Sequence, residues 1–290
     1  MTEHGQPLVD PRRLVFVGGV HRSGTTPLVK ALASHPEISG LTYTNVREDE
    51  GQHLQSVYPA DGAVGGVGRF ARSNAPHLTE RSALVSPQNA RRLVAAWQPY
   101  WDMRRPLLVE KSPPNLLMGR FLQAMFPGSA LIVIVRHPVI VSLASRKWSP
   151  RIISRRGRWR LTLRGLFKNW VQAHETFRRD VAHLSRVHVV YYEDLVSRPH
   201  EELTRIQDFL MLDTAPGTHA LRPDQSDRYR EQWTAMRSRG RLQQWHIERI
   251  ETEFADRVHH LGYDIHDLDR TTTRALATNP PASPPSDVHS

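Results

Sequence analysis

The stretch LVFVGGVHRSGTTPLVKAL, residues 14–32, decides the fold. A short apolar run leads into two glycines, a polar turn follows, and apolar residues at helical spacing come next. This order predicts a buried strand at 14–19, a tight loop, and a helix at 27–34. Glycines let the backbone N–H groups of such a loop point inward, and the helix start adds its positive end. The stretch therefore predicts a phosphate-binding turn.

The turn departs from the Walker template, G-x-x-x-x-G-K-[ST], at one fixed position. Counted from Gly19, Thr25 stands where the template has the lysine that reaches the terminal phosphates of ATP. Arg22 can supply charge instead, and Ser23, Thr25 and Thr26 can supply hydroxyl donors. The alternative interpretation is an ordinary corner between a strand and a helix, where glycine and threonine are common.

Composition limits the class of protein. The chain has 290 residues, of which 39% are hydrophobic, enough for one sizeable α/β domain or two small ones. A net charge of +10 favours anionic partners: nucleotides, acidic substrates, nucleic acid or a membrane surface. No cysteine occurs, which excludes disulfides and thiolate zinc sites. We expect a cytoplasmic protein of bacterial type, because no signal peptide or membrane-spanning run is apparent and arginine far outnumbers lysine.

Further apolar runs predict strands at 106–110, 130–135 and 187–192. Helical patterns separate them, at 86–101, 116–126, 162–184, 200–211 and 240–260. Strands that alternate with helices predict an α/β fold of three layers, in which helices flank a central parallel sheet. We expect a single domain over 13–270, a flexible arm at 1–12 and a disordered tail at 271–290.

In parallel sheets, ligands bind beyond the carboxyl ends of the strands. Lys111 follows the second predicted strand, Arg136 follows the third, and Tyr192 lies at the end of the fourth. An arginine in that place can meet a second phosphate, and a tyrosine can stack or hydrogen-bond near a base. Two cationic positions predict a nucleotide with phosphates at two places. The alternatives are a surface ion pair at Arg136 and a tyrosine that only packs on the sheet edge.

Two motifs together resemble the sulfotransferases that use 3′-phosphoadenosine 5′-phosphosulfate (PAPS). GGVHRSGTT is similar to the family's [RK]-[ST]-G-T-[TS] loop, and IVIVRHP is similar to its strand that ends in R-[DHN]-P. EKSPPN and YYEDL look like motifs of the branch that contains tyrosylprotein sulfotransferases and bacterial sulfotransferases. The resemblance covers residues 14–200, more weakly to 262, and implies a P-loop-like fold.

The resemblance implies which residues hold the 5′ end of PAPS: Arg22, Ser23, Gly24, Thr25 and Thr26. It implies that Arg136 binds the 3′-phosphate together with residues of SLASRK, 142–147, which looks like the family's S-x-x-[ST]-R-K. This points to Ser142 and Arg146. Ser145 stays open, because the gap from Arg136 to Ser142 is two residues shorter than in the family.

Two further positions follow from the resemblance. Tyr192 would lie by the adenosine. SRGRLQQW, 238–245, stands in the place of the family's C-terminal loop that closes on the cofactor, which makes Arg239 and Gly240 candidates for binding it.

The implied reaction is an in-line transfer of the sulfuryl group to a hydroxyl or amine, with adenosine 3′,5′-bisphosphate as product and no metal. Arg22 and Lys111 would stabilise charge on the leaving phosphate. A general base is expected shortly after the first helix, in VREDEGQHLQ. Its candidates are Glu48, Asp49, Glu50 and His53, of which we favour Glu50. A solvated acidic turn is the alternative.

The acceptor is predicted to be a small metabolite, a glycan or a lipid. RIISRRGRWR, 151–160, is interpreted as a solvated loop, a lid, or a strip that contacts an acidic acceptor or a membrane surface. Rival functions are a P-loop nucleotide kinase or NTPase, a nucleic-acid-binding protein, and a PAPS-binding relative without catalysis. The arginines are spread along the chain, so nucleic acid is not an expected partner.

Overall fold

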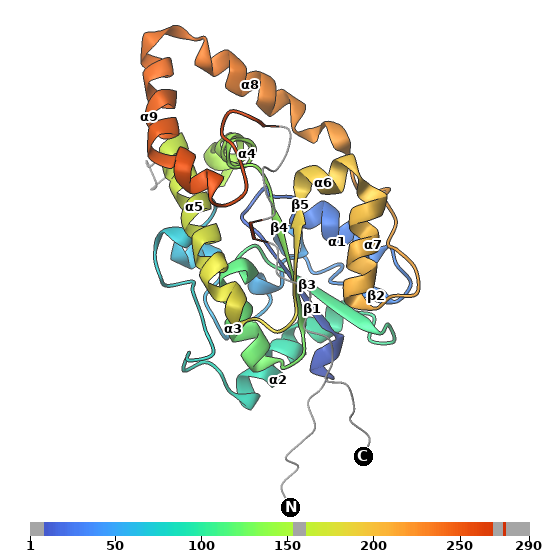
Figure 1. The fold of residues 1–290 in the computed structure, drawn as a ribbon. Helices are drawn as coiled ribbons and strands as arrows, with labels where there is room; N and C mark the ends of the chain where they lie inside the picture. The colour runs from blue at the N-terminus through green and yellow to red at the C-terminus, as the bar shows by residue number, and fades with distance from the viewer. Residues whose placement is uncertain (1–8, 153–160, 269–274, 277–290) are drawn as a thin grey trace, which may run out of the picture.

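A computed structural model describes residues 9–152, 161–268 and 275–276. Its described residues form one five-stranded sheet in the order β2-β3-β1-β4-β5, and every pair of neighbouring strands is parallel. The strands, in sheet order, are Ile38–Gly40, Leu107–Lys111, Leu14–Gly18, Ala130–Val135 and Val187–Tyr191. Helices cover both faces of the sheet (Figure 1). The predicted three-layer α/β fold is confirmed.

The sheet is apolar at nearly every position because both of its faces are buried. Successive side chains of a strand point to opposite faces. Leu14 and Phe16 of β1 accordingly pack into one core cluster, whereas Val15 and Val17 pack into the other. An unbroken apolar run therefore predicted these strands, where an alternating pattern would have indicated a sheet with one wet face.

Each core cluster has its own set of helices. The smaller cluster is covered by α1 (Thr25–Ala33), α6 (Tyr192–Ser197) and α7 (Pro199–Leu210). The larger cluster is covered by α2 (Pro87–Trp97), α3 (Asn115–Met125), α4 (Pro138–Ile152), α5 (Leu163–Asp180), α8 (Asp227–Arg237) and α9 (Gly240–His259). Short 3-10 helices lie at Pro11–Arg13, Arg47–Asp49, Gly51–His53, Asp61–Val64, Phe70–Arg72, Gln98–Tyr100, Val181–His183 and Pro223–Gln225.

Helix starts follow the capping chemistry of the sequence. The Oγ of Ser86 accepts a hydrogen bond from the Asn89 N–H at 3.2 Å, and Pro87 occupies the first turn of α2. The Oγ1 of Thr162 caps α5 in the same way, accepting from the Gly165 N–H at 3.1 Å. The α-helix predicted to run to 101 ends at Trp97, and one 3-10 turn continues it.

Three of the strands and α-helices were not predicted: β2, α6 and α8. The last predicted strand ran through Tyr192, which is instead the first residue of α6. β2 has only three residues, Ile38–Gly40, too few for a recognisable period. The sequence of α8 is DRYREQWTAMR, in which polar and charged residues predominate. Its buried side consists of Tyr229, Trp233 and Met236. β3 is shifted by one residue from the prediction, so Lys111 is its last residue and does not follow it.

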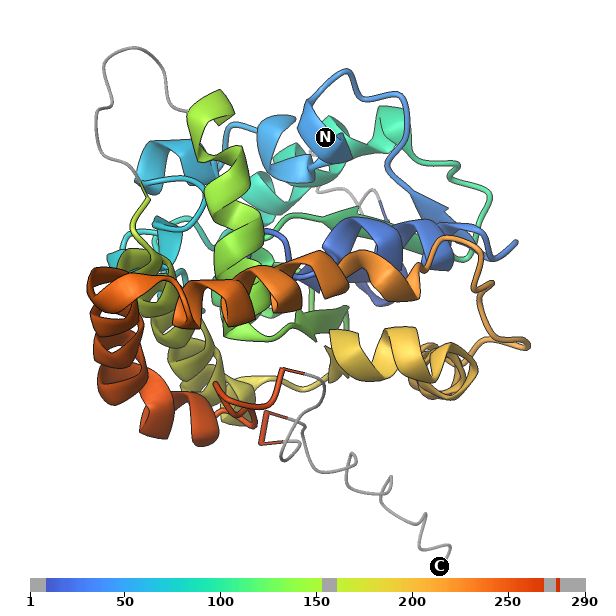
Figure 2. The ribbon, with the colours of Figure 1, turned by 90° about the horizontal axis from the view of Figure 1, so that it is seen from above.

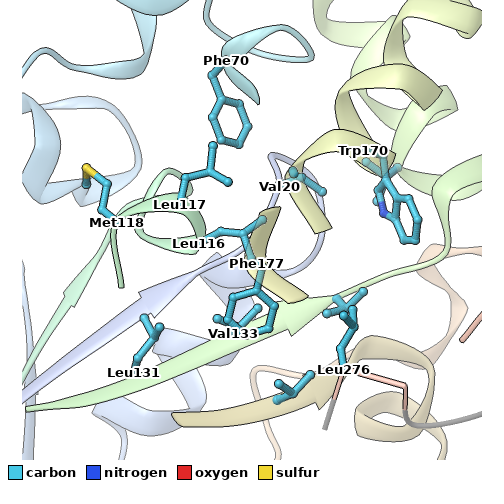
Figure 3. Close-up of a cluster of buried hydrophobic side chains, with 14 of the residues drawn as sticks. Val20, Phe70, Leu116, Leu117, Met118, Leu131, Val133, Trp170, Phe177 and Leu276 are labelled. Atoms are coloured by element: carbon cyan, nitrogen blue, oxygen red, sulfur yellow. The ribbon is translucent and has the colours of Figure 1, made fainter. Parts of the chain in front are cut away.

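Both predicted terminal segments touch the domain where they are described. Val9 is 4% exposed, and Pro11–Arg13 form a 3-10 turn. Leu276 is buried, donates its N–H to the Tyr191 hydroxyl at 3.0 Å, and lies among the core side chains of Figure 3. Leu276 therefore differs from the predicted disordered tail, because its side chain packs into the larger core cluster. Residues 1–8, 153–160, 269–274 and 277–290 lie outside the described residues.

The fold brings the ends of the central strands to one place. Val20, in the turn after β1, is 1% exposed and belongs to the larger core cluster (Figure 3). α8 passes from the neighbourhood of α6 toward α9 across that end of the molecule (Figures 1 and 2).

Within the described ranges, no helix is long and apolar enough to cross a membrane.

Candidate active site

The predicted phosphate-binding turn links β1 to α1. Gly24 is the N-terminal cap of α1, with φ 107°, and it provides no side-chain cap. The first turn of α1 contains no acidic residue. The first N–H groups of a helix have no partner within the helix, and they carry the positive end of its dipole. The start of α1 is therefore suited to an anion.

Glycine is required in the turn by close neighbours. A Cβ on Gly24 would lie 2.5 Å from the Tyr192 ring. A Cβ on Gly19 would lie 2.6 Å from the carbonyl oxygen of Ile134 and from the Oγ of Ser23. The turn thus packs closely against β4 and the start of α6. This packing brings the residues predicted for the 5′ end of the ligand next to Tyr192.

Arg22 has an unusual backbone conformation, with φ 72°. Such a left-handed conformation costs a non-glycine residue of order 1–3 kcal/mol and persists only where the surroundings impose it. The Ser23 N–H donates to the carbonyl of Val20 at 3.1 Å, and Arg136 donates from Nη1 to the carbonyl of Arg22 at 3.2 Å. These two contacts hold the peptide bond that follows Arg22.

The three hydroxyls of the turn differ in their surroundings. Ser23 is fully buried, and its Oγ has no hydrogen-bond partner among the described residues. Thr25 is 6% exposed. Thr26 donates from Oγ1 to the carboxylate of Glu48 at 3.1 Å. Because a buried hydroxyl without a partner is costly, the Ser23 side chain fits a ligand oxygen in the turn.

Lys111 lies beside the turn because β3 pairs with β1, with Val17 opposite Lys111. Only 3% of Lys111 is exposed. Its ammonium group donates to the carbonyl of Glu48 at 2.7 Å, and it lies 3.4 Å from both the Thr26 hydroxyl and the Glu50 carboxylate. The predicted catalytic cation thus joins the turn to the acidic segment.

The four candidates for a base occupy different positions. Glu48 is exposed, and its side chain reaches the turn. Asp49 accepts hydrogen bonds from the hydroxyl and the N–H of Thr44, at 2.5 and 3.2 Å, so it stabilises its own loop. Glu50 is 6% exposed and contacts Lys111. The Nε2 of His53 lies 3.5 Å from the Glu50 carboxylate.

The neighbours of Glu50 keep it ionised. Burial alone would raise the pKa of Glu50, but the hydrogen bond from His53 and the charge of Lys111 outweigh it, so the pKa lies below its ordinary value. The same hydrogen bond raises the pKa of His53. Gln52 completes the group by donating from Nε2 to Glu50 at 2.7 Å.

Arg136 follows β4 and is 6% exposed. Its guanidinium carbon lies 3.9 Å from the centre of the Tyr192 ring, and its Nη2 donates to the Ser226 hydroxyl at 2.7 Å. Burial lowers the pKa of Arg136. The structure therefore brings both predicted residues, Arg136 and Tyr192, against the turn.

The other predicted contacts of the 3′-phosphate lie on α4 and at the α8–α9 junction. Ser142 is fully buried, and its Oγ has no hydrogen-bond partner in the described chain, whereas Ser145 is 2% exposed. Arg146 and Arg239 line one cavity of about 300 Å³. No hydrogen bond between described residues joins either arginine to Arg136. Gly240 has φ 66° and begins α9.

Sequence reasoning missed three supporting residues. Ser226 comes from a segment without any motif. Glu193 accepts the N–H of His137 at 2.9 Å and the hydroxyl of Tyr263 at 2.8 Å, and so fixes the turn after Arg136. Its place in YYEDL was the available signal. Gln52 donates its N–H to the Ser112 hydroxyl at 2.9 Å, a contact that no spacing in the sequence indicates.

Glu110 lies directly beneath this site. It is fully buried and accepts hydrogen bonds from the Ser112 hydroxyl and the Asn115 amide, both at 2.6 Å. Burial raises the pKa of Glu110 to about 7, despite both hydrogen bonds and the charge of Lys111. In the described residues, no group of three or more histidine, aspartate or glutamate side chains is arranged to hold a metal ion.

The fold is that of an α/β protein of the P-loop-like class, and its first turn is suited to an anion. The model of the Sulfotransferase family matches residues 14–216, and the chain belongs to that family. A protein-tyrosine sulfotransferase of Drosophila melanogaster is 27% identical over 206 residues. That match covers 68% of this chain but only 38% of the relative's length.

Two solved sulfotransferase structures are similar to this chain. Sulfotransferase STF9 from Mycobacterium avium has a TM-score of 0.53 and 15% identity, with 89% of this chain and 78% of that chain covered. Mouse sulfotransferase SULT7A1, solved in complex with PAP, has a TM-score of 0.43 and 12% identity, with 75% and 65% covered. The first of these likenesses shows that the fold is that of a sulfotransferase.

Proposed function

We propose that the protein transfers the sulfuryl group of PAPS to a hydroxyl or amine of an acceptor and leaves adenosine 3′,5′-bisphosphate. One observation carries the proposal: a turn suited to an anion contacts Lys111 on one side and Arg136 on the other. Membership of the sulfotransferase family supports the same reaction.

The residues of the turn fit the 5′ end of PAPS. The start of α1 is open to an anion, and the buried Oγ of Ser23 lacks a partner among the described residues. We assign the 5′ end to five consecutive residues, Arg22, Ser23, Gly24, Thr25 and Thr26. Backbone N–H groups and hydroxyls of this kind neutralise phosphate oxygens without a metal ion.

The 3′-phosphate is assigned to Arg136 and a serine of α4. Ser142 is favoured over Ser145, because its buried hydroxyl lacks a described partner. Tyr192 lies between Gly24 and the Arg136 guanidinium, so we place it beside the nucleotide, where it supports both ends.

Arg146, Arg239 and Gly240 are assigned to the outer side of the 3′ end. The two arginines share a cavity at the far end of α8, which begins beside Arg136.

Bound PAPS supplies an activated sulfuryl group on a phosphate leaving group. Arg22 and Lys111 would offset the negative charge that grows on that phosphate. Glu50 is proposed as the base that takes the acceptor's proton, because it is ionised and lies next to Lys111. General base catalysis of this kind contributes about 10²–10⁴-fold.

We propose a small metabolite, a glycan or a lipid as acceptor. The named activity of the Drosophila relative adds protein tyrosine as a further candidate. A membrane contact through 151–160, a cytoplasmic location and a bacterial source stay predictions. The rival function is a nucleotide kinase. It is disfavoured because this chain has Thr25 at the position of the Walker lysine.

The first test compares ligands by thermal unfolding. Adenosine 3′,5′-bisphosphate at 100 times its Kd should stabilise the protein by about 2.7 kcal/mol, and ATP with magnesium should stabilise it far less. A larger shift with ATP and magnesium would favour the kinase. Binding of a DNA duplex with a steep salt dependence would instead indicate a nucleic-acid-binding protein.

The second test separates the roles of the residues. Arg22→Ala and Lys111→Ala should each reduce sulfuryl transfer by about 10²-fold or more, as loss of a charge-stabilising group does. Glu50→Gln should lower kcat by a similar factor while PAP affinity stays within about twofold. Wild-type rates in any of the three would remove that residue's assigned role. A panel of phenol, sugar, lipid and tyrosine-peptide acceptors identifies the substrate class.

A further inference from the structure

His21 and Asp61 form a buried pair next to the turn. His21 immediately precedes Arg22, whereas Asp61 begins a 3-10 helix 40 positions later. The Nε2 of His21 lies 2.8 Å from the Oδ2 of Asp61, and the two residues are 7% and 5% exposed. No motif of the sequence indicates this contact, and the proposed reaction assigns it no role.

The pair is fixed from outside the turn. The ring of Phe70 packs edge-to-face on the His21 ring, with centroids 5.3 Å apart. The N–H of Asp61 donates to the side-chain oxygen of Gln52 at 2.8 Å. Gln52 also contacts Glu50, so Asp61 is tied to the segment that approaches Lys111.

Asp61 is ionised in this contact. Burial alone would raise the pKa of Asp61, but the hydrogen bond and the charge of His21 outweigh it and hold the pKa below its ordinary value. A hydrogen bond to a buried carboxylate is stronger than one between neutral groups. The hydrogen bond between His21 and Asp61 is therefore charge-assisted, and it ties His21 to the 61–64 segment.

We propose that His21 and Asp61 are positioning residues that hold Arg22 in its left-handed conformation, so that its guanidinium meets the sulfuryl end of PAPS. The proposal rests on the proposed function. A strained backbone conformation persists only where several surrounding contacts impose it. Arg136 and the Ser23 N–H restrain the turn at and after Arg22, and His21 is the side chain that anchors it before Arg22.

A double-mutant cycle in PAPS binding tests whether His21 acts through Arg22. Arg22→Ala should weaken PAPS binding by about 10-fold or more, the size of a charge-assisted hydrogen bond. His21→Ala should weaken it by a similar or smaller factor. The double variant should bind PAPS like Arg22→Ala alone, within about twofold, because the anchor has nothing left to position. Effects that multiply in full would overturn the proposal.

Two further variants separate positioning from folding. His21→Gln, whose amide can still donate to Asp61, should recover most of the lost PAPS affinity. His77→Ala breaks a comparable pair elsewhere, since the His77 Nε2 lies 2.7 Å from Asp180, and it should leave PAPS affinity unchanged. Equal losses in His21→Gln and His21→Ala would contradict the role of the hydrogen bond. An equal loss in His77→Ala would mean that general destabilisation is being measured.

Hydrogen exchange of the ligand-free protein tests, without PAPS, whether the His21–Asp61 pair holds the turn. In His21→Ala, the amides of 22–26 should exchange about 10-fold faster or more, while those of α5 keep their rates. Unchanged exchange at 22–26 would overturn the proposal. If the wild-type protein binds neither PAPS nor PAP, the proposed function fails, yet the exchange rates still show whether the pair holds the turn.

Discussion

Glu110 and Lys111 are consecutive residues whose side chains point to opposite faces of β3. Lys111 faces the turn and ends among hydrogen-bond acceptors, so its charge is compensated. Glu110 faces the larger core, where two hydrogen bonds do not fully replace water. The pair places an ionisable acid in the core directly beneath the proposed active site.

Glu110 should make the protein less stable as the pH rises. Its pKa is about 7 in the folded protein, against an ordinary value of 4.5, so the folded state binds the extra proton between these two values. The free energy of unfolding should therefore fall across this window, by roughly 3 kcal/mol at most. Glu110→Gln should remove that slope. Urea unfolding at pH 4.5, 6 and 8 measures it, and parallel pH profiles for both proteins would contradict the role of Glu110.

The sequence predicted the positions of Lys111 and Arg136 but not the residues that contact and orient the site. Lys111 and Arg136 could be predicted because residues at the carboxyl ends of parallel strands share one edge of the sheet. Ser226 and Asp61 come from irregular segments, whose positions depend on tertiary packing and leave no period in the sequence. The choice among the acidic residues of 48–53 likewise needed side-chain contacts, which show that Asp49 is engaged within its own loop.

At the scale of elements, the turn and α1 depend on Gly24, where any side chain would be strained. Gly24 has φ 107°, and a Cβ there would lie 2.5 Å from the Tyr192 ring. Tyr192 in turn lies under Arg136. A change at Gly24 therefore displaces residues assigned to both ends of the nucleotide.

Gly24→Ala should cost more stability than Gly240→Ala. Both positions have positive φ, so each substitution carries a backbone cost of roughly 1–2 kcal/mol. Only Gly24 adds a steric clash, since a Cβ on Gly240 would meet no non-neighbouring atom of the described residues within 4 Å. The clash should add about 1–3 kcal/mol, measured by urea unfolding. Equal costs for the two variants would mean that the Tyr192 ring moves aside freely.

The elements that sequence patterns identified are the ones whose burial is strongest. β1 and β4 are buried at every position, and their apolar runs predicted them. α8 was missed because only three of its residues, Tyr229, Trp233 and Met236, form its buried side, in a segment of low hydropathy. β2 was missed because three residues define no period.

At the scale of the whole molecule, the site joins segments that are far apart in the chain. The turn after β1, the start of α4 and the start of α8 meet through Arg136, which contacts both Arg22 and Ser226. α8 lies across this end of the molecule (Figure 2). A nucleotide with phosphates at its 5′ and 3′ positions should therefore order three segments together.

Hydrogen exchange with and without adenosine 3′,5′-bisphosphate tests this. The nucleotide should slow exchange at 19–26, at 136–146 and at 226–236, because its two phosphates would engage the turn and Arg136, and Arg136 holds Ser226. The region of Asp180, at the far end of α5, should not change and serves as an internal control. Adenosine 5′-monophosphate, which lacks the 3′-phosphate, should protect 19–26 alone. Identical protection by both nucleotides would show that Arg136 does not read the 3′-phosphate, and the assignment of the second phosphate site would then be wrong.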